Sequence, residues 1–261
     1  MTLTPIKPDI NAYPAELHQL LINANIYDSS CSKAAQVIFI DKDDGYFLKS
    51  APKDALKHEA TMTRYFHSKG VAANVLAYIS DERDYMLTTK VHGSDGTTPV
   101  YIEQPERLCD IFAERLAELH AFDFSDCPIQ NHTEQFIKKA ETNKFQGSYD
   151  KSHFPDSWGY KNEEEAWSVI EKNRCFLRTD TLLHGDYCLP NIVLNNWKFA
   201  AFIDLDQGGV GDRHVDIFWA AWTLYWNLKT QKYKNRFFDA YGRDKIDEEM
   251  LRVVAALEVF S

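Results

Sequence analysis

The chain has 261 residues, with 44% hydrophobic and 13% aromatic side chains and a formal net charge of −10 at pH 7. This composition excludes a disordered chain, and the acidic balance argues against a nucleic-acid-binding protein and suits a cationic ligand, although many proteins are acidic only for solubility. Neither a signal peptide nor an apolar run of about 18 residues is visible, so we expect a cytoplasmic protein that does not enter a membrane.

The first 90 residues have the pattern of a small sheet with one main helix. Strand-like runs cover residues 35–41 and 46–50, joined by a turn at 42–45 as a hairpin, and residues 75–79 and 85–89. Residues 14–24 predict a first helix and residues 54–69 the main one, with Asp54 as its N-cap and Gly70 as its stop.

The rest of the chain has mainly helical periodicity. A Gly-, Ser- and Thr-containing segment, residues 92–99, is the expected boundary between a lobe of residues 1–90 and one of residues 91–261. Helices are predicted at 105–122, 134–143 and 163–173, short strands at 181–183, 192–194 and 199–203, and helices again from 212 onward. We therefore expect an α+β protein, with a sheet-rich N-terminal lobe and a larger, mostly helical C-terminal lobe.

The chemistry is concentrated between residues 182 and 216. Asp186 follows His184-Gly185, Asn191 comes five positions later, and a two-strand hairpin then returns the chain to Asp204. The hairpin should place Asp204 beside Asn191, and a carboxylate with an amide oxygen suits Mg²⁺ that also binds phosphate. Asp186 would then reach a bound hydroxyl, as phosphoryl transfer requires. The alternative interpretation is a simple turn in which Asn191 only caps a helix.

The segments HGDYCLPNI and FIDLDQGGVGDRHVDI resemble the catalytic and metal loops of the aminoglycoside phosphotransferases, especially the 3′-phosphotransferase group. YFLKSAPKDALKHEATMTRYFHSKG, DYMLTTKVHG, AERLAELHAFD and the C-terminal FFDAYGRDKIDEEMLRVVAALEVF are similar to that group as well. The resemblance implies a two-lobed, protein kinase-like fold. It also implies Mg²⁺-dependent transfer of the γ-phosphoryl group of ATP, or of GTP, to the 3′-hydroxyl of an aminoglycoside, which gives antibiotic resistance.

Two alternatives share this resemblance. One is another small-molecule kinase of the same fold, acting on choline, a sugar or a macrolide. The other is a nucleotide-binding pseudokinase, which the joint presence of Lys49, Asp186, Asn191 and Asp204 argues against. The expected partner is a small cationic molecule, and not a nucleic acid or a membrane, bound by a monomer or a weak dimer.

The resemblance also assigns roles to single residues. It implies that Asp186 is the catalytic aspartate, that Asn191 and Asp204 are metal ligands, and that Lys49 holds the α- and β-phosphates. Glu59 is the candidate ion-pair partner of Lys49, with Glu16 as an alternative. The glycine-free loop 29–34 would cover the triphosphate, and residues 88–91 would contact the base. We therefore expect Ser32, Thr88 and Val91 to contact the nucleotide. His184 and Asp216 are expected to support the catalytic and metal loops and not to react.

The predicted acceptor contacts are acidic or aromatic. Asp156 and the run Glu163–Glu165 lie in the polar segment where the related enzymes place an acidic substrate loop, although the run also suits a helix N-terminus. Glu258 and Phe260 resemble the C-terminal substrate contacts. The aromatic run 218–226 could form a cage for a cation, but the spacing of Phe218, Trp222 and Tyr225 favours core packing.

Two residues of the metal loop depart from the family pattern. Asp206 stands where relatives commonly have Gly, and Gln207 stands where some have Arg. A further carboxylate could attract a second ion or a cationic substrate, or could simply point into solvent.

Overall fold

The computed structural model describes residues 3–31, 35–150 and 160–261. Contacts within the chain group it into two compact units. Unit 1 consists of Met1–Asp95 and Pro190–Gln207, and unit 2 of Gly96–Leu189 and Gly208–Ser261. The assignment of residues 1–90 to nucleotide binding and of 91–261 to catalysis is a functional division, and it stays a prediction.

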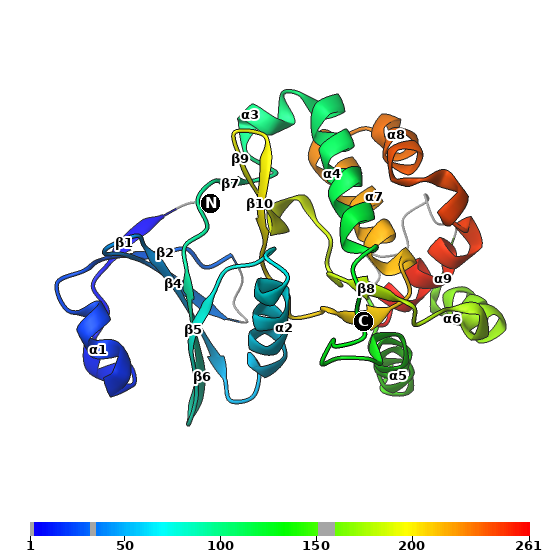
Figure 1. The fold of residues 1–261 in the computed structure, drawn as a ribbon. Helices are drawn as coiled ribbons and strands as arrows, with labels where there is room; N and C mark the ends of the chain where they lie inside the picture. Colours follow the sequence, from blue (N-terminus) through cyan, green and yellow to red (C-terminus); the bar gives the residue numbers. More distant parts are fainter. Residues whose placement is uncertain (1–2, 32–34, 151–159) are drawn as a thin grey trace. The chain divides into compact units, whose positions relative to one another are not determined.

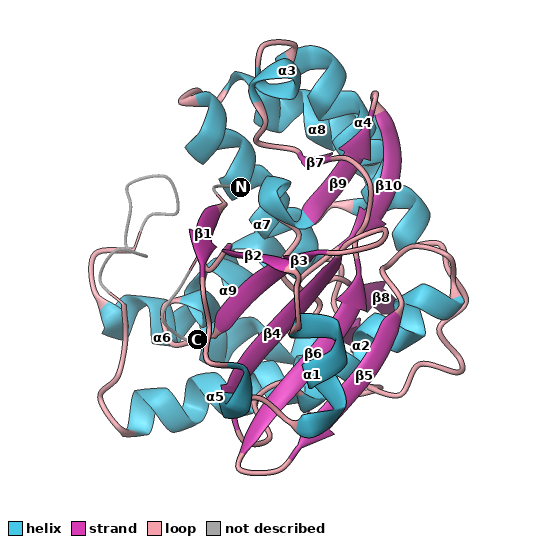
Figure 2. Ribbon diagram, turned by 90° about the vertical axis from the view of Figure 1, so that its left-hand side faces the viewer, coloured by secondary structure: helices cyan, strands magenta, loops and turns pink. Residues whose placement is uncertain are grey.

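Unit 1 is built on a six-stranded antiparallel sheet with the strand order β1-β2-β3-β4-β6-β5. Figure 2 shows β4, β6 and β5 side by side in this sheet. The predicted hairpin and the two later strands are confirmed. The bounds are β1 (Thr4–Ile6), β2 (Asn25–Asp28), β3 (Gln36–Asp41), β4 (Tyr46–Pro52), β5 (Val75–Ser80) and β6 (Arg83–Thr89).

One helix covers each face of this sheet. Leu48 and its neighbours on one face pack against α1 (Ala15–Leu21), whereas Ala51 and Met86 on the other pack with Ala60 of α2 (Lys57–Ser68) (Figure 1). Because successive side chains of a strand point to opposite faces, Lys49 shares its face with Ala51. Lys49 is therefore presented on the side of the sheet that α2 covers.

The start of α2 differs from the prediction. Asp54 was the expected N-cap, but its φ is +66° and the cap position is occupied by Leu56, which has no side-chain oxygen. The buried carboxylate of Asp84 replaces the cap and accepts the Leu56 backbone N–H at 2.9 Å. The same carboxylate accepts the hydroxyl groups of Tyr78 and Ser80. The cap therefore comes from the sheet, which sequence proximity did not reveal.

A second, three-stranded sheet of unit 1 carries the predicted metal ligands. It has the order β10-β9-β7, with β7 (Ser94–Asp95), β9 (Ile192–Asn195) and β10 (Lys198–Phe202). The predicted hairpin of β9 and β10 is confirmed, and η4 (Leu189–Asn191) leads into it. Phe202 donates its backbone N–H to Val71, which ties the hairpin to the segment that follows α2.

Unit 2 is mostly helical (Figure 1, green to red). In α4 (Pro105–Leu119), Leu108, Phe112, Leu116 and Leu119 of the predicted periodic positions are buried, whereas Ile111 and Arg115 are half-buried. A two-stranded sheet of β8 (Thr181–Leu183) and β11 (Gly209–Gly211) lies among the helices. The helices are α3 (Pro99–Ile102), α4 (Pro105–Leu119), α5 (His132–Phe145), α6 (Glu163–Asn173), α7 (His214–Leu228), α8 (Lys232–Tyr241) and α9 (Glu248–Glu258).

Helix α7 contains the aromatic run, and its packing is only partly as expected. Phe218 is buried and Trp222 is half-buried, in line with a core role. Tyr225 was also expected in the core, but it is 46% exposed, and Trp226 beside it is 55% exposed. Thr223 and Leu224 in the same part of the helix are buried, so Tyr225 and Trp226 lie on the side of α7 that faces away from the core. Within the described residues, no helix is long and apolar enough to span a bilayer.

Candidate active site

The Lys49 ammonium is shared by two carboxylates of unit 1. Its Nζ lies 2.7 Å from Oε2 of Glu59 on α2 and 2.8 Å from Oδ1 of Asp204. Asp204 follows β10 and has φ +61°, a left-handed conformation that Asp tolerates better than most residues. The partner in the structure is thus Glu59, and not Glu16, which is an exposed residue of α1.

Burial and neighbouring charges shift the pKa values of Glu59 and Lys49. The Glu59 side chain is 5% exposed. Its burial, opposed by Lys49 but reinforced by Asp204 and Asp206, raises the pKa of the Glu59 carboxyl to about 7. Burial alone would lower the pKa of Lys49, but Glu59 and Asp204 together raise it above its ordinary value. Lys49 therefore remains a cation that can hold phosphate oxygens.

Asn191 and Asp204 form a donor set that fits Mg²⁺. Ile203 donates its backbone N–H to the Asn191 carbonyl at 3.0 Å, so the residue before Asp204 is bonded to Asn191. The Asp204 carboxylate already faces a cation, the Lys49 ammonium. The described residues contain no cluster of three or more His, Cys, Asp or Glu side chains that could hold a metal. Nucleotide phosphates would therefore have to complete the shell around an ion at these two residues.

The predicted catalytic residue, Asp186, lies on a rigid loop of unit 2 that follows β8. The carboxylate of Asp216 in the first turn of α7 accepts the backbone N–H of His184 at 2.8 Å and of Gly185 at 2.7 Å. Cys188 then donates its backbone N–H to the Asp186 carbonyl at 2.8 Å. The predicted supports His184 and Asp216 are thus in contact, although the contact uses the main chain of His184.

His120, at the end of α4, is a support that the sequence reasoning missed. Its Nε2 lies 3.0 Å from Oδ2 of Asp216, and its Nδ1 lies 2.8 Å from the hydroxyl of Tyr241 on α8. Burial lowers the pKa of His120, although Asp216 acts in the opposite direction. His120 is visible in the segment AELHAFD, at the end of a predicted helix. A single His there does not reveal that its hydrogen-bond partner lies 96 positions later in the chain.

Further hydrogen bonds hold the loop on both sides of Asp186. The Tyr187 hydroxyl donates to the Phe112 carbonyl at 2.8 Å, and the Leu189 N–H donates to Oγ1 of Thr223 at 3.2 Å. Both anchors lie on helices of unit 2, α4 and α7. The Asp186 side chain therefore projects from a backbone that is fixed before and after it.

The predicted nucleotide contacts other than Lys49 and Glu59 are placed only in part. Ser32 lies outside the described residues. Thr88 is in β6 opposite Phe47 of β4, and Val91 is half-buried in the segment that follows β6. Their roles in binding the base stay predictions.

The predicted acceptor contacts lie at the C-terminal end of unit 2, except for Asp156, which is outside the described residues. Glu258 is 5% exposed, and its carboxylate accepts the indole N–H of Trp219 at 3.0 Å and the hydroxyl of Ser261 at 2.6 Å. Phe260 is 1% exposed and packs edge-on against Trp167. Its ring does not face solvent, and its role as a substrate contact stays a prediction.

The acidic run at the start of α6 has structural partners. Asn162 caps the helix by accepting the Glu165 N–H at 2.9 Å, and Glu165 accepts the Lys161 N–H. Glu164 pairs with Lys144 at 2.5 Å. These contacts are those of a helix N-terminus, where acidic residues also suit the helix dipole.

The two departures in the metal loop are paired with each other. The Gln207 amide donates to Oδ2 of Asp206 at 3.1 Å. Gln207 is exposed and Asp206 is half-buried in unit 1. The extra carboxylate is therefore engaged by its neighbour, and it contributes to the raised pKa of Glu59.

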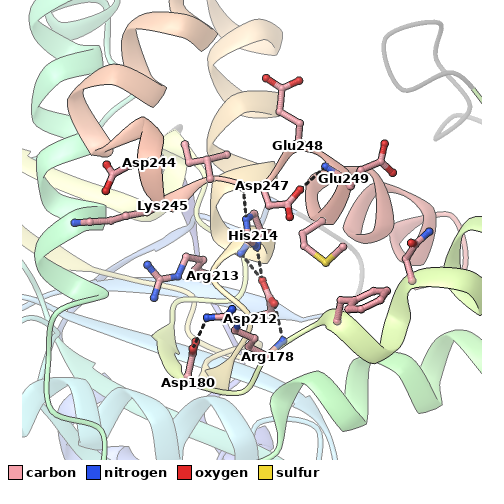
Figure 3. Close-up of a pocket in the computed structure, with 14 residues that line it drawn as sticks. Arg178, Asp180, Asp212, Arg213, His214, Asp244, Lys245, Asp247, Glu248 and Glu249 are labelled. Atoms are coloured by element: carbon pink, nitrogen blue, oxygen red, sulfur yellow. Dashed lines mark hydrogen bonds and ion pairs between the residues drawn. The ribbon is translucent and has the colours of Figure 1, made fainter.

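A cavity of about 860 Å³ lies at the other end of β8, inside unit 2 (Figure 3). On its wall, His214 pairs through Nδ1 with Asp212 at 2.6 Å, and its Nε2 accepts the backbone N–H of Asp247, the N-cap of α9. Asp212 also accepts the Arg178 N–H at 2.7 Å. Both basic and acidic side chains line the cavity, and the hydrogen bond from Asp247 to His214 joins the start of α9 to that of α7.

Residues 32–256 match the model of the phosphotransferase enzyme family. The chain is 49% identical over 261 residues to a probable aminoglycoside 3′-phosphotransferase of Lactococcus lactis subsp. lactis (strain IL1403), with 99% of this chain and 98% of that protein covered. A crystal structure of an aminoglycoside 3′-phosphotransferase of type VIII aligns with a TM-score of 0.72 at 21% identity over 96% of each chain.

A structure from Streptomyces rimosus, an aminoglycoside phosphotransferase in complex with ADP and streptomycin, aligns with a TM-score of 0.67 at 19% identity. It covers 85% of this chain and 90% of the other. These structural likenesses confirm the predicted kinase-like α+β fold, with its N-terminal antiparallel sheet and larger helical part.

Proposed function

This chain belongs to the phosphotransferase enzyme family, as the sequence predicted, and we propose that it transfers the γ-phosphoryl group of ATP to the 3′-hydroxyl of an aminoglycoside, giving resistance. The observation that supports the chemistry most strongly is the ammonium of Lys49 held between Glu59 and Asp204. The identity with a probable aminoglycoside 3′-phosphotransferase supports the choice of acceptor.

Unit 1 would bind the nucleotide. Lys49 would hold the α- and β-phosphates, and Asn191 and Asp204 would hold Mg²⁺. When bound, the ion neutralises charge on the β- and γ-phosphates. Glu59 keeps the Lys49 side chain in place, so that the ammonium needs little reorganisation when the nucleotide arrives. A complex of a structural neighbour with ADP supports a nucleotide donor. We propose ATP as the donor, with GTP as the alternative.

Unit 2 would act on the acceptor. Asp186 would orient the acceptor hydroxyl and accept its proton during direct, in-line transfer to the γ-phosphorus. Asp216 and His120 fix the loop so that this carboxylate is presented in one position. Glu258 and Phe260 would contribute to the acceptor site, as the resemblance implies. We further propose that the protein is cytoplasmic and acts as a monomer or a weak dimer, without nucleic acid.

A coupled ADP-release assay tests the proposed activity. With ATP and Mg²⁺ we expect turnover of kanamycin and neomycin, but not of tobramycin, which lacks the 3′-hydroxyl. If the enzyme turns over choline or a sugar but none of the drugs, the proposed kinase chemistry is supported and the proposed aminoglycoside acceptor is wrong. Choline in the same panel therefore separates the alternative small-molecule kinases from the proposed one.

Replacing Asp186 tests its role independently. We expect Asp186→Ala to lower kcat about a hundred- to ten-thousandfold, which is the range of general acid–base catalysis, while ATP binding changes little. Equilibrium binding of ATP to the variant is the control, because a loss of both binding and turnover would contradict a purely catalytic role.

A further inference from the structure

Three indole rings form a continuous stripe along α7. The Trp219 and Trp222 rings meet edge to face with centroids 5.5 Å apart, and those of Trp222 and Trp226 stack with an interplanar angle of 7° at 5.4 Å. Trp219 and Trp222 are half-buried, whereas Trp226 is 55% exposed. This aromatic stripe (Trp219, Trp222 and Trp226) thus runs from the interior of unit 2 to its surface.

The inner end of the aromatic stripe meets a carboxylate. The Trp219 indole N–H donates to Oε1 of Glu258 at 3.0 Å, and Ser261 donates to the other oxygen. The hydrogen bond therefore anchors the Trp219 ring at the inner end of the aromatic stripe. With its inner ring held in this way, the stripe presents its outer ring, Trp226, in a defined position.

The aromatic stripe also lies next to the catalytic loop. The helical turn that begins at Trp219 contains Thr223, whose Oγ1 accepts the Leu189 N–H three residues after Asp186. The Cys188 thiol lies 4.0 Å from the Trp219 carbonyl. All of these contacts are within unit 2, so the geometry relating the aromatic stripe to the loop of Asp186 is internal to one compact unit.

The outer ring already binds a cation of this chain. The Lys229 ammonium lies 4.2 Å from the centroid of the Trp226 ring. Lys229 is an exposed residue that ends α7 in a left-handed conformation, with φ +55°. An ammonium group thus lies over the exposed end of the aromatic stripe, and an incoming ligand amine could take the same position.

We propose that the aromatic stripe is a wall of the acceptor site and selects amino sugars by stacking. The apolar face of a sugar ring packs on the outer face of Trp226, which Trp222 backs by stacking, and an ammonium group of the ligand displaces that of Lys229. This inference rests on the proposed function and adds a specificity determinant to it. Binding between copies of the chain is a weaker account, because the exposed part of the stripe is small beside the area that a stable interface buries.

Alanine variants of the two outer rings test the inference. We expect Trp226→Ala and Trp222→Ala to raise KM for kanamycin about three- to thirtyfold, the range of a cation–π contact, and to leave KM for ATP within about twofold. Trp226→Phe should keep most of the affinity because it retains an aromatic face. Phe176→Ala is the matched control, since Phe176 is 63% exposed in unit 2 but lies on another element.

Binding of tobramycin, measured by calorimetry without turnover, separates the inference from the proposed function. Weaker binding of tobramycin by Trp226→Ala than by the wild type and Phe176→Ala supports the inference, even if no drug is phosphorylated. Equal binding by all variants overturns it, even if kanamycin is phosphorylated. Failure of the wild type to bind any aminoglycoside would overturn both. Because Trp226 is exposed, its replacement by Ala should not impair folding, so weaker binding would not result from misfolding. An unchanged thermal unfolding temperature of the variant would verify that it is folded.

Discussion

His120 and Asp216 are joined by a hydrogen bond of 3.0 Å between Nε2 and Oδ2, although 96 positions separate them in the chain. Because the Asp216 carboxylate only accepts, Nε2 is the donor, and Nδ1 is left to accept the hydroxyl of Tyr241 at 2.8 Å. A neutral imidazole therefore links α4, α7 and α8 directly behind the loop that presents Asp186.

Replacing His120 should loosen this loop. We expect His120→Ala to lower the free energy of unfolding by about 2 kcal/mol, because a buried carboxylate loses a donor, and to lower kcat more than KM for ATP. Chemical denaturation and steady-state kinetics measure the two effects. His92→Ala, a change of an exposed histidine, should alter neither, and an equally active, equally stable His120→Ala enzyme would refute the positioning role.

The buried imidazole also makes stability depend on pH. The pKa of His120 is lowered in the folded protein by burial, whereas in the unfolded chain it is near 6.5. The unfolded state therefore binds the proton first, so this contribution to stability is complete above about pH 6.5 and decreases as the pH falls toward the folded pKa. We expect the stability difference between wild type and His120→Gln to narrow between pH 8 and pH 5.5; a constant difference would contradict this.

If Asp204 holds Mg²⁺ as proposed, Glu59 should control how readily the ion binds. Lys49 is divided between the two carboxylates at nearly equal distances, so removing Glu59 leaves the ammonium on Asp204 alone. We expect Glu59→Ala to raise the Mg²⁺ concentration for half-maximal activity several-fold, because Lys49 then competes with the ion. Titration with Mg²⁺ at saturating ATP measures this, with Glu16→Ala as the control. Identical Mg²⁺ dependence in the two variants would disprove the competition.

Asp84 should matter for stability and not for chemistry. It is fully buried and accepts hydrogen bonds from the Leu56 backbone, Tyr78 and Ser80. We expect Asp84→Ala to cost about 3 kcal/mol in urea unfolding, since three donors lose a charged partner. Asp81→Ala, in the turn just before β6, removes an exposed carboxylate and should change stability by less than about 0.5 kcal/mol.

Much of the candidate site could be predicted because its residues are close in the sequence or lie on regular elements. Asp186, Asn191 and Asp204 belong to one continuous segment, and the hairpin between the last two fixes their proximity. Lys49 was assigned through its resemblance to the nucleotide-binding lysine, whereas the face of the sheet that α2 covers comes from the structure. Its choice of Glu59 over Glu16 needed the structure, because both are helical glutamates.

What could not be predicted depends on contacts between distant segments. Asp84 binds the backbone of Leu56, 28 positions earlier and at the cap position of α2, so local sequence pointed to Asp54 instead. The link from His120 to Asp216 likewise depends on the packing of separate helices. Tyr225 has the helical spacing of a buried residue, but it lies on the exposed side of α7 although Leu224 beside it is buried, and spacing does not reveal how wide the covered face of a helix is.

The position of the phosphate on the product tests the central claim most directly. Kanamycin incubated with the enzyme, ATP and Mg²⁺ should give one phosphorylated product, whose phosphorus couples in a two-dimensional ³¹P–¹H NMR spectrum to the proton on carbon 3′. Coupling to the proton of any other carbon, or an unmodified drug after prolonged incubation, would contradict the proposed 3′-phosphotransferase activity.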